Sequence, residues 1–390
     1  MVMDSLGITD LDDRDTPFPT LNTSNFSSLF SDKHIPFTDK TVNSYNIKYL
    51  KCGGNHTLIL LENGILIGAG ELRELRNDYI INDGWFLLNY KIYEFIKSEL
   101  NGLVDILTIE SISTCWDSTF IGIKNLEKNI VQIFSFGQQC KMELGRPECN
   151  SKFNVLSSDI DCVASELHSC LYTTIAVFRY VNNSTVLYGW GFNNKQQLFE
   201  TQNKSDKFIQ SPKIVKQFLN NPNVEFRLGK DFLIILNYKE NSLLCLGNPK
   251  LKTEVEQKKV SLNKISNVIV MWSSLHFLYD NKSLVSLGNG QLGQLSLNNS
   301  HLGPVKFLEA GSEHIIYTSV NEPFIVSSWG WGEHGNCGKL DKNKNNINEQ
   351  QIFTQPNEIL NLQKNEFNNY NKIQNVYGGC ASTFILITKE

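Results

Sequence analysis

The chain has 390 residues, of which 41% are hydrophobic and 11% aromatic, so it carries enough apolar material for a large core. Its net charge of -4 argues against a nucleic-acid backbone as the main partner. No apolar run approaches the roughly 20 residues that span a bilayer, and the acidic stretch 1–15 lacks the basic and apolar regions of a signal peptide. The nine cysteines, without a Cys-x-x-Cys pair, indicate free thiols in a reducing compartment.

Residues 1–46 are rich in Ser, Thr and Asp, and we expect them to be mostly loop, followed by one folded domain over residues 47–390. The first clear element is a hairpin in which two apolar strands flank the dipeptide Asn63–Gly64. Asn-Gly supports the positive backbone φ that a tight hairpin turn needs. The segment 85–100 is ambiguous, because its apolar spacing partly fits a helix while its middle also fits a strand.

A strand that ends in Gly-x-Gly and runs into a polar turn is the clearest recurring pattern in the sequence. The best copy is residues 328–338, Ser-Trp-Gly-Trp-Gly-Glu-His-Gly-Asn-Cys-Gly. Internal repeats indicate a fold built from one repeated unit, and glycine lets crowded backbones approach closely where such units meet. Weaker copies lie at 188–193 and 287–290, and degenerate ones at 67–70, 136–137 and 246–248.

A second signature precedes these strand exits and gives the repeat count. It consists of a small residue, then His or Ser three positions later, then an apolar run. Seven copies predict an all-β chain that folds as a seven-bladed β-propeller. The last copy has no Gly-x-Gly after it, so a closing strand from the N-terminus would be needed to protect the edge at 384–388. The copies begin at residues 53, 115, 165, 229, 273, 311 and 379.

Histidine recurs in the second signature at what we interpret as one repeat position. A set of imidazole rings at a shared position suits a metal site. Phe232 takes that position in another copy, however, and phenylalanine is not a metal ligand. We therefore interpret the histidines as structural side chains that join one repeat to the next by hydrogen bonds. They are His56, His168, His276 and His314.

The turns of the second signature also carry side chains suited to partner binding. Trp116 and Trp272 lie just before the strands, where a tryptophan anchors an interface well, and Lys230 lies in the corresponding turn of the fourth copy. The turn carboxylates either recognise a partner or are simply solvated, and nothing in the sequence sets the separation that an acid–base pair needs. The candidate partner-binding residues are Trp116, Asp117, Lys230, Asp231, Trp272, Glu313, Glu333 and His334.

Two local motifs are compatible with chemistry, and both have simpler structural interpretations. Glu333, His334 and Cys337 have the spacing of a metal site or a nucleophile pair, but no second ligand pair lies nearby in the sequence. Residues 288–293 match Gly-x-Gly-x-x-Gly, but residues 294–299 do not begin a helix. P-loop, Gly-x-Ser-x-Gly and His-Glu-x-x-His motifs are absent from the sequence. We therefore expect a protein that is not an enzyme and needs neither a cofactor nor a metal of its own.

The paired signatures resemble the repeats of the regulator-of-chromosome-condensation family, whose members are seven-bladed β-propellers. The resemblance spans residues 50–387, nearly the whole chain. It is closest to a fungal subfamily of alpha-tubulin suppressors, also described as killer-toxin-insensitivity proteins. The stretches that carry it are 52–56, 115–119, 271–276, 311–314, 330–338 and 378–384.

The resemblance implies a non-catalytic scaffold. Members of this subfamily form a heterodimer with a small CSL-type zinc-finger protein. That partner serves diphthamide synthesis on elongation factor two and the Elongator-dependent modification of wobble uridines in transfer RNA. The resemblance thus implies an indirect link to the Elongator complex, no direct contact with nucleic acid or a membrane, and a location in the cytoplasm and the nucleus.

The start of the chain departs from the family pattern. Family members begin with a strand of the form apolar-Tyr-x-Phe-Gly-Ser-Asn that closes the last blade, whereas residues 5–17 resemble the segment that comes after this strand in the family. Either residues are missing before Leu6 or the last blade is incomplete, and we favour the first explanation. The founding family member suggests an alternative function, guanine-nucleotide exchange on a small nuclear GTPase, although its basic N-terminal tail has no counterpart in the acidic residues 1–15.

Overall fold

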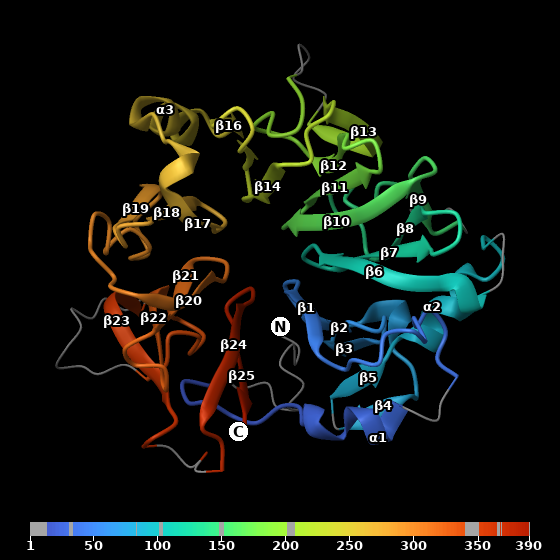
Figure 1. Cartoon of the computed structure of the whole chain (residues 1–390), viewed down its shortest axis with the longest axis horizontal. Helices are drawn as coiled ribbons and strands as arrows, with labels where there is room; N and C mark the ends of the chain where they lie inside the picture. Colours follow the sequence, from blue (N-terminus) through green and yellow to red (C-terminus); the bar gives the residue numbers. More distant parts are fainter. Residues whose placement is uncertain are drawn as a thin grey trace. The chain divides into compact units, whose positions relative to one another are not determined.

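The computed structural model describes residues 14–30, 34–82, 84–100, 104–147, 152–200, 207–339, 351–364, 367 and 369–389, so the start of the chain, on which closure of the last blade depends, lies outside the described residues. The described chain forms two compact units. Pro19–Val224 belongs to the first unit, and the second unit combines residues 14–18 with the chain from Glu225 onward. Figure 1 follows both units along the sequence.

The first unit consists of three antiparallel sheets, each built mainly from consecutive strands. Short helical segments, η1 (Thr23–Asn25), α1 (Phe26–Phe30), η2 (Arg73–Leu75), α2 (Asn89–Ile96) and η3 (Val104–Ile106), accompany the sheets. Sheet A has the order β1 (Ile47–Cys52), β2 (His56–Leu61), β3 (Leu66–Gly70), β5 (Trp85–Leu87), β4 (Ile80–Asn82). Sheet B contains β6 (Leu107–Thr114), β7 (Ser118–Asn125), β8 (Ile130–Gly137) and β9 (Asn154–Ser157). Sheet C contains β10 (Cys162–Cys170), β11 (Thr173–Tyr180), β12 (Thr185–Phe192) and β13 (Phe208–Phe218).

The second unit repeats the same antiparallel order in three sheets and a hairpin. Sheet D contains β14 (Val224–Leu228), β15 (Phe232–Asn237) and β16 (Ser242–Gly247), followed by α3 (Pro249–Lys258) and η4 (Leu262–Lys264). Sheet E contains β17 (Ile265–Val270), β18 (Ser274–Tyr279) and β19 (Leu284–Gly288). Sheet F contains β20 (Val305–Ala310), β21 (His314–Ser319), β22 (Ile325–Trp331) and β23 (Ile352–Asn361). Hairpin G contains only β24 (Lys372–Gly378) and β25 (Thr383–Thr388).

The all-β prediction is confirmed, but the prediction of seven blades is wrong. Within the described residues there are six sheets of three to five strands, and the seventh signature copy forms only the two-stranded hairpin G. Within the described residues, hairpin G lacks the third strand that each of the six sheets has, so it is not a complete blade. The number of signature copies therefore equals the number of turns, but it does not predict how many strands each sheet contains.

The hairpin predicted at Asn63–Gly64 is confirmed, and the ambiguous segment that follows is resolved. Gly64 has φ +88°, and its N–H donates to Leu61 O at 3.0 Å, which closes the turn between β2 and β3. The segment 85–100 contains both a strand, β5, and a helix, α2. Buried Asn89 joins them to the core, because its Oδ1 accepts from Leu66 N at 2.8 Å. The middle of the segment, 90–96, is therefore helix, and the alternative of a strand there is wrong; the strand lies before it, at Trp85–Leu87.

In sheet D, helix α3 packs where the other sheets of the chain mostly have a fourth strand. Asn248 caps the helix by accepting from the N–H groups of its first turn, and Pro249 fits the first helical position. Leu251 and Val255 are buried in one cluster with Cys245 of β16. Each such side chain stabilises the fold by about 2 kcal/mol. The helix thus covers the outer strand of sheet D. None of the described helices combines the length and the apolar character needed to cross a membrane.

Candidate partner-binding face of the signature turns

Each signature turn joins the first and second strands of its sheet and has four positions. In six turns the N–H of position one donates to the carbonyl of position four, and these bonds close the turn. The six pairs are Gly53–His56, Cys115–Ser118, Gly229–Phe232, Met271–Ser274, Gly311–His314 and Gly379–Ser382, at 2.8 to 2.9 Å. In sheet C the corresponding pair is Cys170 and Thr173, which face each other in the β10–β11 ladder.

Successive turns within a unit are tied together through their main chains. In the first unit, Gly54 N donates to Trp116 O at 3.0 Å, and Trp116 N donates to Leu171 O at 2.9 Å. Position two of one turn is thereby bonded to position two of the next. In the second unit, Lys230 N donates to Trp272 O at 2.9 Å, and Trp272 continues the series to the turn of sheet F. The main chains at position two of successive turns therefore lie next to one another within each unit.

Only two of the four predicted histidines share a repeat position. His56 and His314 occupy position four, whereas His168 lies inside β10 and His276 lies two residues beyond position four of its turn. The prediction of one common position was wrong because the pattern of a small residue followed three positions later by His or Ser also matches residues that lie within a strand. In sheet C the true turn is 170–173, not the copy that begins at 165.

The two position-four histidines join neighbouring sheets, as expected for a structural role. His56 Nε2 lies 3.0 Å from Thr119 Oγ1 in sheet B, and His314 Nε2 lies 3.0 Å from Thr383 Oγ1 in hairpin G. Thr383 Oγ1 donates to Asn336 O at 2.8 Å, so the histidine is the donor in that pair. Burial lowers the pKa of each histidine to about 4, which keeps both rings neutral.

The other two histidines bond locally. His276 is buried between Ser274 Oγ at 2.9 Å and Ser286 Oγ at 2.8 Å, and burial lowers its pKa to about 3. His168 lies 3.4 Å from Glu166, whose carboxylate also accepts from the Arg179 guanidinium at 2.7 Å. Across the described part of the chain, no group of three or more His, Cys, Asp or Glu side chains is arranged to hold a metal ion.

The predicted turn carboxylates at position three are engaged within the fold. Asp117 accepts from Asn55 Nδ2 at 3.1 Å and lies 3.4 Å from the Arg73 guanidinium. Asp231 accepts from Asn248 Nδ2 at 3.1 Å. Because these contacts come from neighbouring segments of the same unit, the two carboxylates organise the face.

Glu313 and Glu333 differ sharply in exposure. Glu313 is buried and accepts from Ser273 Oγ at 2.9 Å and Gln294 Nε2 at 2.7 Å, and burial raises its pKa. Glu333 is exposed and accepts from the indole N–H of Trp331 at 3.0 Å. Glu333 is thus the exposed one among the four predicted carboxylates.

The predicted tryptophans and lysine are half-buried on the turn face. The Trp116 ring lies so close above Gly54 that a Cβ atom there would be 2.5 Å from it. Trp272 and Lys230 occupy position two of adjacent turns. His334 packs edge-on against the Trp331 ring, with centroids 5.2 Å apart, in the strand exit of sheet F. The structure therefore groups Trp272 with Lys230 and, separately, His334 with Glu333.

Sequence reasoning missed an aromatic and cationic cluster on the same face. Lys141, in the exit of sheet B, places its Nζ 4.3 Å from the centre of the Tyr172 ring and 4.6 Å from that of Phe192. Tyr172 is position three of the sheet C turn, and burial raises its pKa. The turn at 170–173 has Thr173 at position four instead of histidine or serine, so the signature did not find it. An aromatic residue just before a long apolar strand was the one available signal.

Comparisons with known proteins agree with this repeat structure. No protein-family model matches the chain. An RCC1 (regulator of chromosome condensation) repeat-containing protein of Schizosaccharomyces pombe is 22% identical over 338 residues, which cover 83% of this chain and 87% of that protein. The structure of Prp20p from Saccharomyces cerevisiae is similar with a TM-score of 0.60 and 16% identity, over 88% of this chain and 83% of that one. Human WBSCR16 gives a TM-score of 0.55 with 13% identity, over 88% and 87%. These likenesses support the RCC1-repeat family and identify the fold of this chain as an RCC1-type β-propeller.

Proposed function

We propose that the protein is a non-catalytic scaffold whose signature-turn face binds a small CSL-type zinc-finger protein. Through this partner it would support Elongator-dependent modification of wobble uridines in transfer RNA and diphthamide biosynthesis, in the cytoplasm and the nucleus. The resemblance of the signature stretches to the fungal subfamily supports the identity of the partner. The observation that supports a binding role is the main-chain linkage of successive turns, which holds position-two side chains in fixed order.

A linked row of turns suits protein recognition for two physical reasons. Side chains on main-chain-bonded turns lose little conformational freedom on binding, because the backbone is already fixed. Tryptophan and tyrosine are also among the residues that dominate interface hot spots. In the second unit Trp272 lies in the turn next to that of Lys230, and in the first unit Trp116 lies next to the turn of Tyr172, whose ring Lys141 covers. On this proposal the scaffold acts by covering part of the partner's metal site and so controlling access to it.

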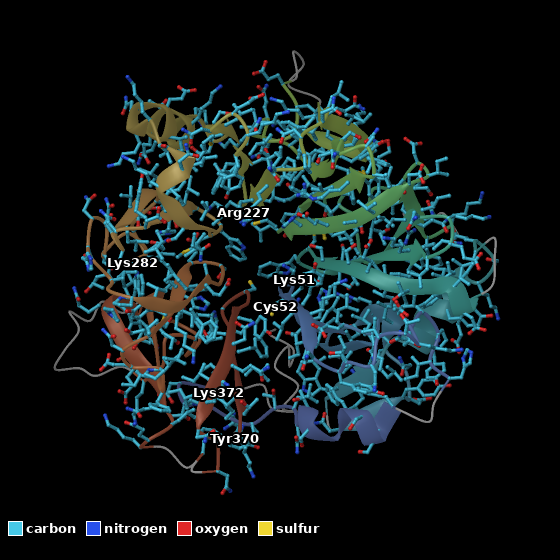
Figure 2. All side chains as sticks on the ribbon, viewed as in Figure 1. Lys51, Cys52, Arg227, Lys282, Tyr370 and Lys372 are labelled. Atoms are coloured by element: carbon cyan, nitrogen blue, oxygen red, sulfur yellow. The ribbon has the colours of Figure 1, made fainter. Side chains whose placement is uncertain are left out.

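The proposal is tested by binding of purified full-length protein to the purified small CSL-type zinc-finger protein, measured by calorimetry. Trp272→Ala and Lys230→Glu each remove a central contact, and we expect each to weaken binding by roughly 10- to 100-fold. Lys282→Glu is the matched control, because it reverses the same charge in the same unit. Lys282, labelled in Figure 2, lies in the turn between β18 and β19, at the other end of those strands. Unchanged affinity in both test variants would contradict the proposal.

The alternative function is guanine-nucleotide exchange on a small nuclear GTPase. It is favoured by the structural likeness to Prp20p, which was described together with its binding properties toward Gsp1p and histones. A nucleotide-release assay with fluorescently labelled GDP on a purified Ran-type GTPase separates the two functions. Release accelerated by catalytic amounts of this protein would make exchange the leading function. Release at the intrinsic rate, together with tight binding of the zinc-finger protein, would support the scaffold.

A further inference from the structure

A main-chain hydrogen bond closes five of the sheets at the end opposite the signature turns. In each, the N–H of the residue that follows the second strand donates to the carbonyl of the residue that precedes the first strand, at 2.8 to 3.1 Å. The donors therefore share one repeat position, which we call the end position. They are Glu62, Leu126, Val181, Asp280 and Val320, in sheets A, B, C, E and F.

The end position does not need an apolar side chain for folding. Glu62 and Asp280 place exposed carboxylates there in sheets A and E, and the same main-chain bond still forms. Leu126 and Val181 occupy it in sheets B and C, which lie side by side in the first unit (Figure 1). These two residues are 39% and 62% exposed. Exposed apolar residues that the fold does not need are typical of a contact surface when they lie together.

Two further exposed apolar residues flank the end position of sheet C. Asp161, whose carbonyl accepts from Val181 N at 3.1 Å, lies between Ile160 and the first residue of β10. Val163 is left out of the regular pairing between β10 and β11, as a bulged residue is. Ile160 and Val163 are 65% and 43% exposed. Both therefore add apolar surface next to Val181.

Two hydrogen bonds bring the end position of sheet B next to these residues. Lys124 Nζ, near the end of β7, donates to Val163 O at 2.7 Å. Cys162 N donates to Asn129 O at 2.8 Å, and Asn129 lies in the same turn as Leu126. Four exposed apolar residues of the described chain therefore gather at one end of sheets B and C. This apolar patch consists of Leu126, Ile160, Val163 and Val181.

The border of the apolar patch is acidic. Glu127, Asp159 and Asp161 are exposed, and each is next to a patch residue in the sequence. Lys128 is the exposed basic residue of the two connecting segments that hold them. Lys124, the other nearby cation, is already paired with a carboxylate of β6 at 3.6 Å. The charges around the patch therefore favour a positively charged partner.

We propose that the apolar patch docks a basic, apolar segment of another protein. Burial of the four apolar side chains would stabilise the contact, and Lys or Arg side chains of the segment would face Glu127, Asp159 and Asp161. A second copy of this chain is a poorer occupant, because the acidic border would then face itself. The patch lies at the opposite end of the strands from the signature turns, so the proposal stands independently of the zinc-finger partner.

The test uses a defined probe, a fluorescein-labelled peptide of the sequence Leu-Lys-Lys-Leu-Leu-Lys-Leu-Leu-Lys-Lys-Leu-Leu, whose binding to the full chain is measured by fluorescence anisotropy. The test variant combines Leu126→Gln with Val181→Asn. Both new side chains are neutral counterparts of Glu62 and Asp280 at the end position, so the fold and the net charge are kept. We expect this variant to bind the peptide about tenfold or more weakly. Val320→Asn, at the end position of sheet F, is the matched control and should bind as the wild type does.

A second pair of measurements tests the charge of the occupant. Asp159→Asn combined with Asp161→Asn should weaken binding of the peptide by about threefold to tenfold at low salt, and the difference should disappear at about 1 M salt. The same peptide with Glu in place of every Lys should bind about tenfold or more weakly. Equal binding of the two peptides would overturn the proposal, and so would equal affinity of the patch variant and the wild type.

A photo-cross-linking amino acid in place of Val181, in the full chain and in the cells it comes from, identifies the natural occupant. We expect a cross-linked segment that has Lys or Arg between apolar residues and that the Leu-Lys peptide displaces. A cross-link to an acidic segment or to a second copy of this chain would overturn the proposal. The absence of any cross-link that the peptide displaces would also overturn it.

Discussion

The signature turns of sheets A and B differ at two linked positions. In sheet A, position one is Gly53 and position four is the ring of His56, whereas in sheet B these positions are Cys115 and Ser118. A Cβ atom on Gly53 would lie 2.4 Å from the main-chain oxygen of Cys115 and 2.5 Å from His56 Cε1, although the φ of Gly53 is outside the left-handed region. Space rather than backbone strain therefore demands the glycine. A ring at position four therefore selects glycine at position one, whereas Ser118 at position four of sheet B leaves room for the Cys115 side chain.

In the second unit, two of the four signature turns have a ring at position four, and both have glycine at position one. The turn 379–382 has glycine at position one although position four is Ser382. Gly229 lies against the Phe232 ring, with a Cβ atom 2.3 Å from it, so the rule needs a ring and not specifically an imidazole. Met271 precedes Ser274 in the turn of sheet E, where no ring occupies position four. The histidine adds a second feature, since only the imidazole reaches a threonine of the next sheet.

The largest expected effect comes from breaking the rule at Gly311. A Cβ atom there would lie 2.0 Å from His314 Cε1 and 2.6 Å from Gly379 O, and neither atom belongs to a flexible side-chain end. We expect Gly311→Ala to destabilise the protein by about 3 kcal/mol, as overpacking of a rigid site does. Urea unfolding measures it. Gly303→Ala is the control, because Gly303 has φ +71° but nothing within 4 Å, and about 1 kcal/mol is expected from strain alone.

A double variant tests whether positions one and four are coupled. Gly311→Ala combined with His314→Ser recreates the kind of turn found in sheet B. It removes the ring contact but keeps the contact with the Gly379 carbonyl, so about half of the lost stability should return. Additive losses in the double variant would show that positions one and four are not coupled through space.

A smaller effect is expected from acid, because a turn with histidine at position four should lose stability as the pH falls, whereas a turn with serine there should not. The pKa of His56 is lowered by burial to about 4, below the unfolded value of 6.5. The unfolded chain therefore binds more protons between these values, and the stability present above about pH 6.5 is lost as the pH falls toward 4. We expect His56→Phe to lose about 2 kcal/mol less stability than the wild type between about pH 7.5 and pH 5. Urea unfolding at the two pH values measures it, and equal losses would contradict a buried neutral His56.

The repeat architecture was readable from the sequence, whereas the register of the turns was not. Glycine-terminated strands and apolar runs locate strands because backbone crowding and burial act locally. The spacing of small residue to histidine also fits inside β10 and across Ser273 to His276, however, so it misplaced His168 and His276. The register of each turn is defined by the main-chain hydrogen bond from position one to position four. The spacing of residue types in the sequence does not show where this bond forms.

The candidate face was predicted in part, for a similar reason. The sequence placed Trp116, Trp272 and Lys230 in turns, and the structure confirms that position. It gave no sign that Asn55 of the preceding turn would hold Asp117, because that contact joins residues 62 apart in the chain. The Lys141 cluster was missed for the same reason. Contacts between repeats depend on how sheets are placed beside one another, and a pattern within one repeat does not contain that information.

The smallest expected effect tests whether the histidine acts as a bond or only as a ring. His56→Phe and Thr119→Val, alone and together, form a double-mutant cycle, and His314→Phe with Thr383→Val forms its counterpart in the second unit. Both pairs are 3.0 Å apart, but Thr119 is buried and Thr383 is half-buried. We expect a coupling of about 1 kcal/mol for the first pair, because an unmade buried bond is not replaced by water. The second pair should couple more weakly, since water reaches Thr383. Zero coupling in the first pair would mean that the imidazole of His56 stabilises the turn only by packing, as the phenyl ring of Phe232 does in sheet D.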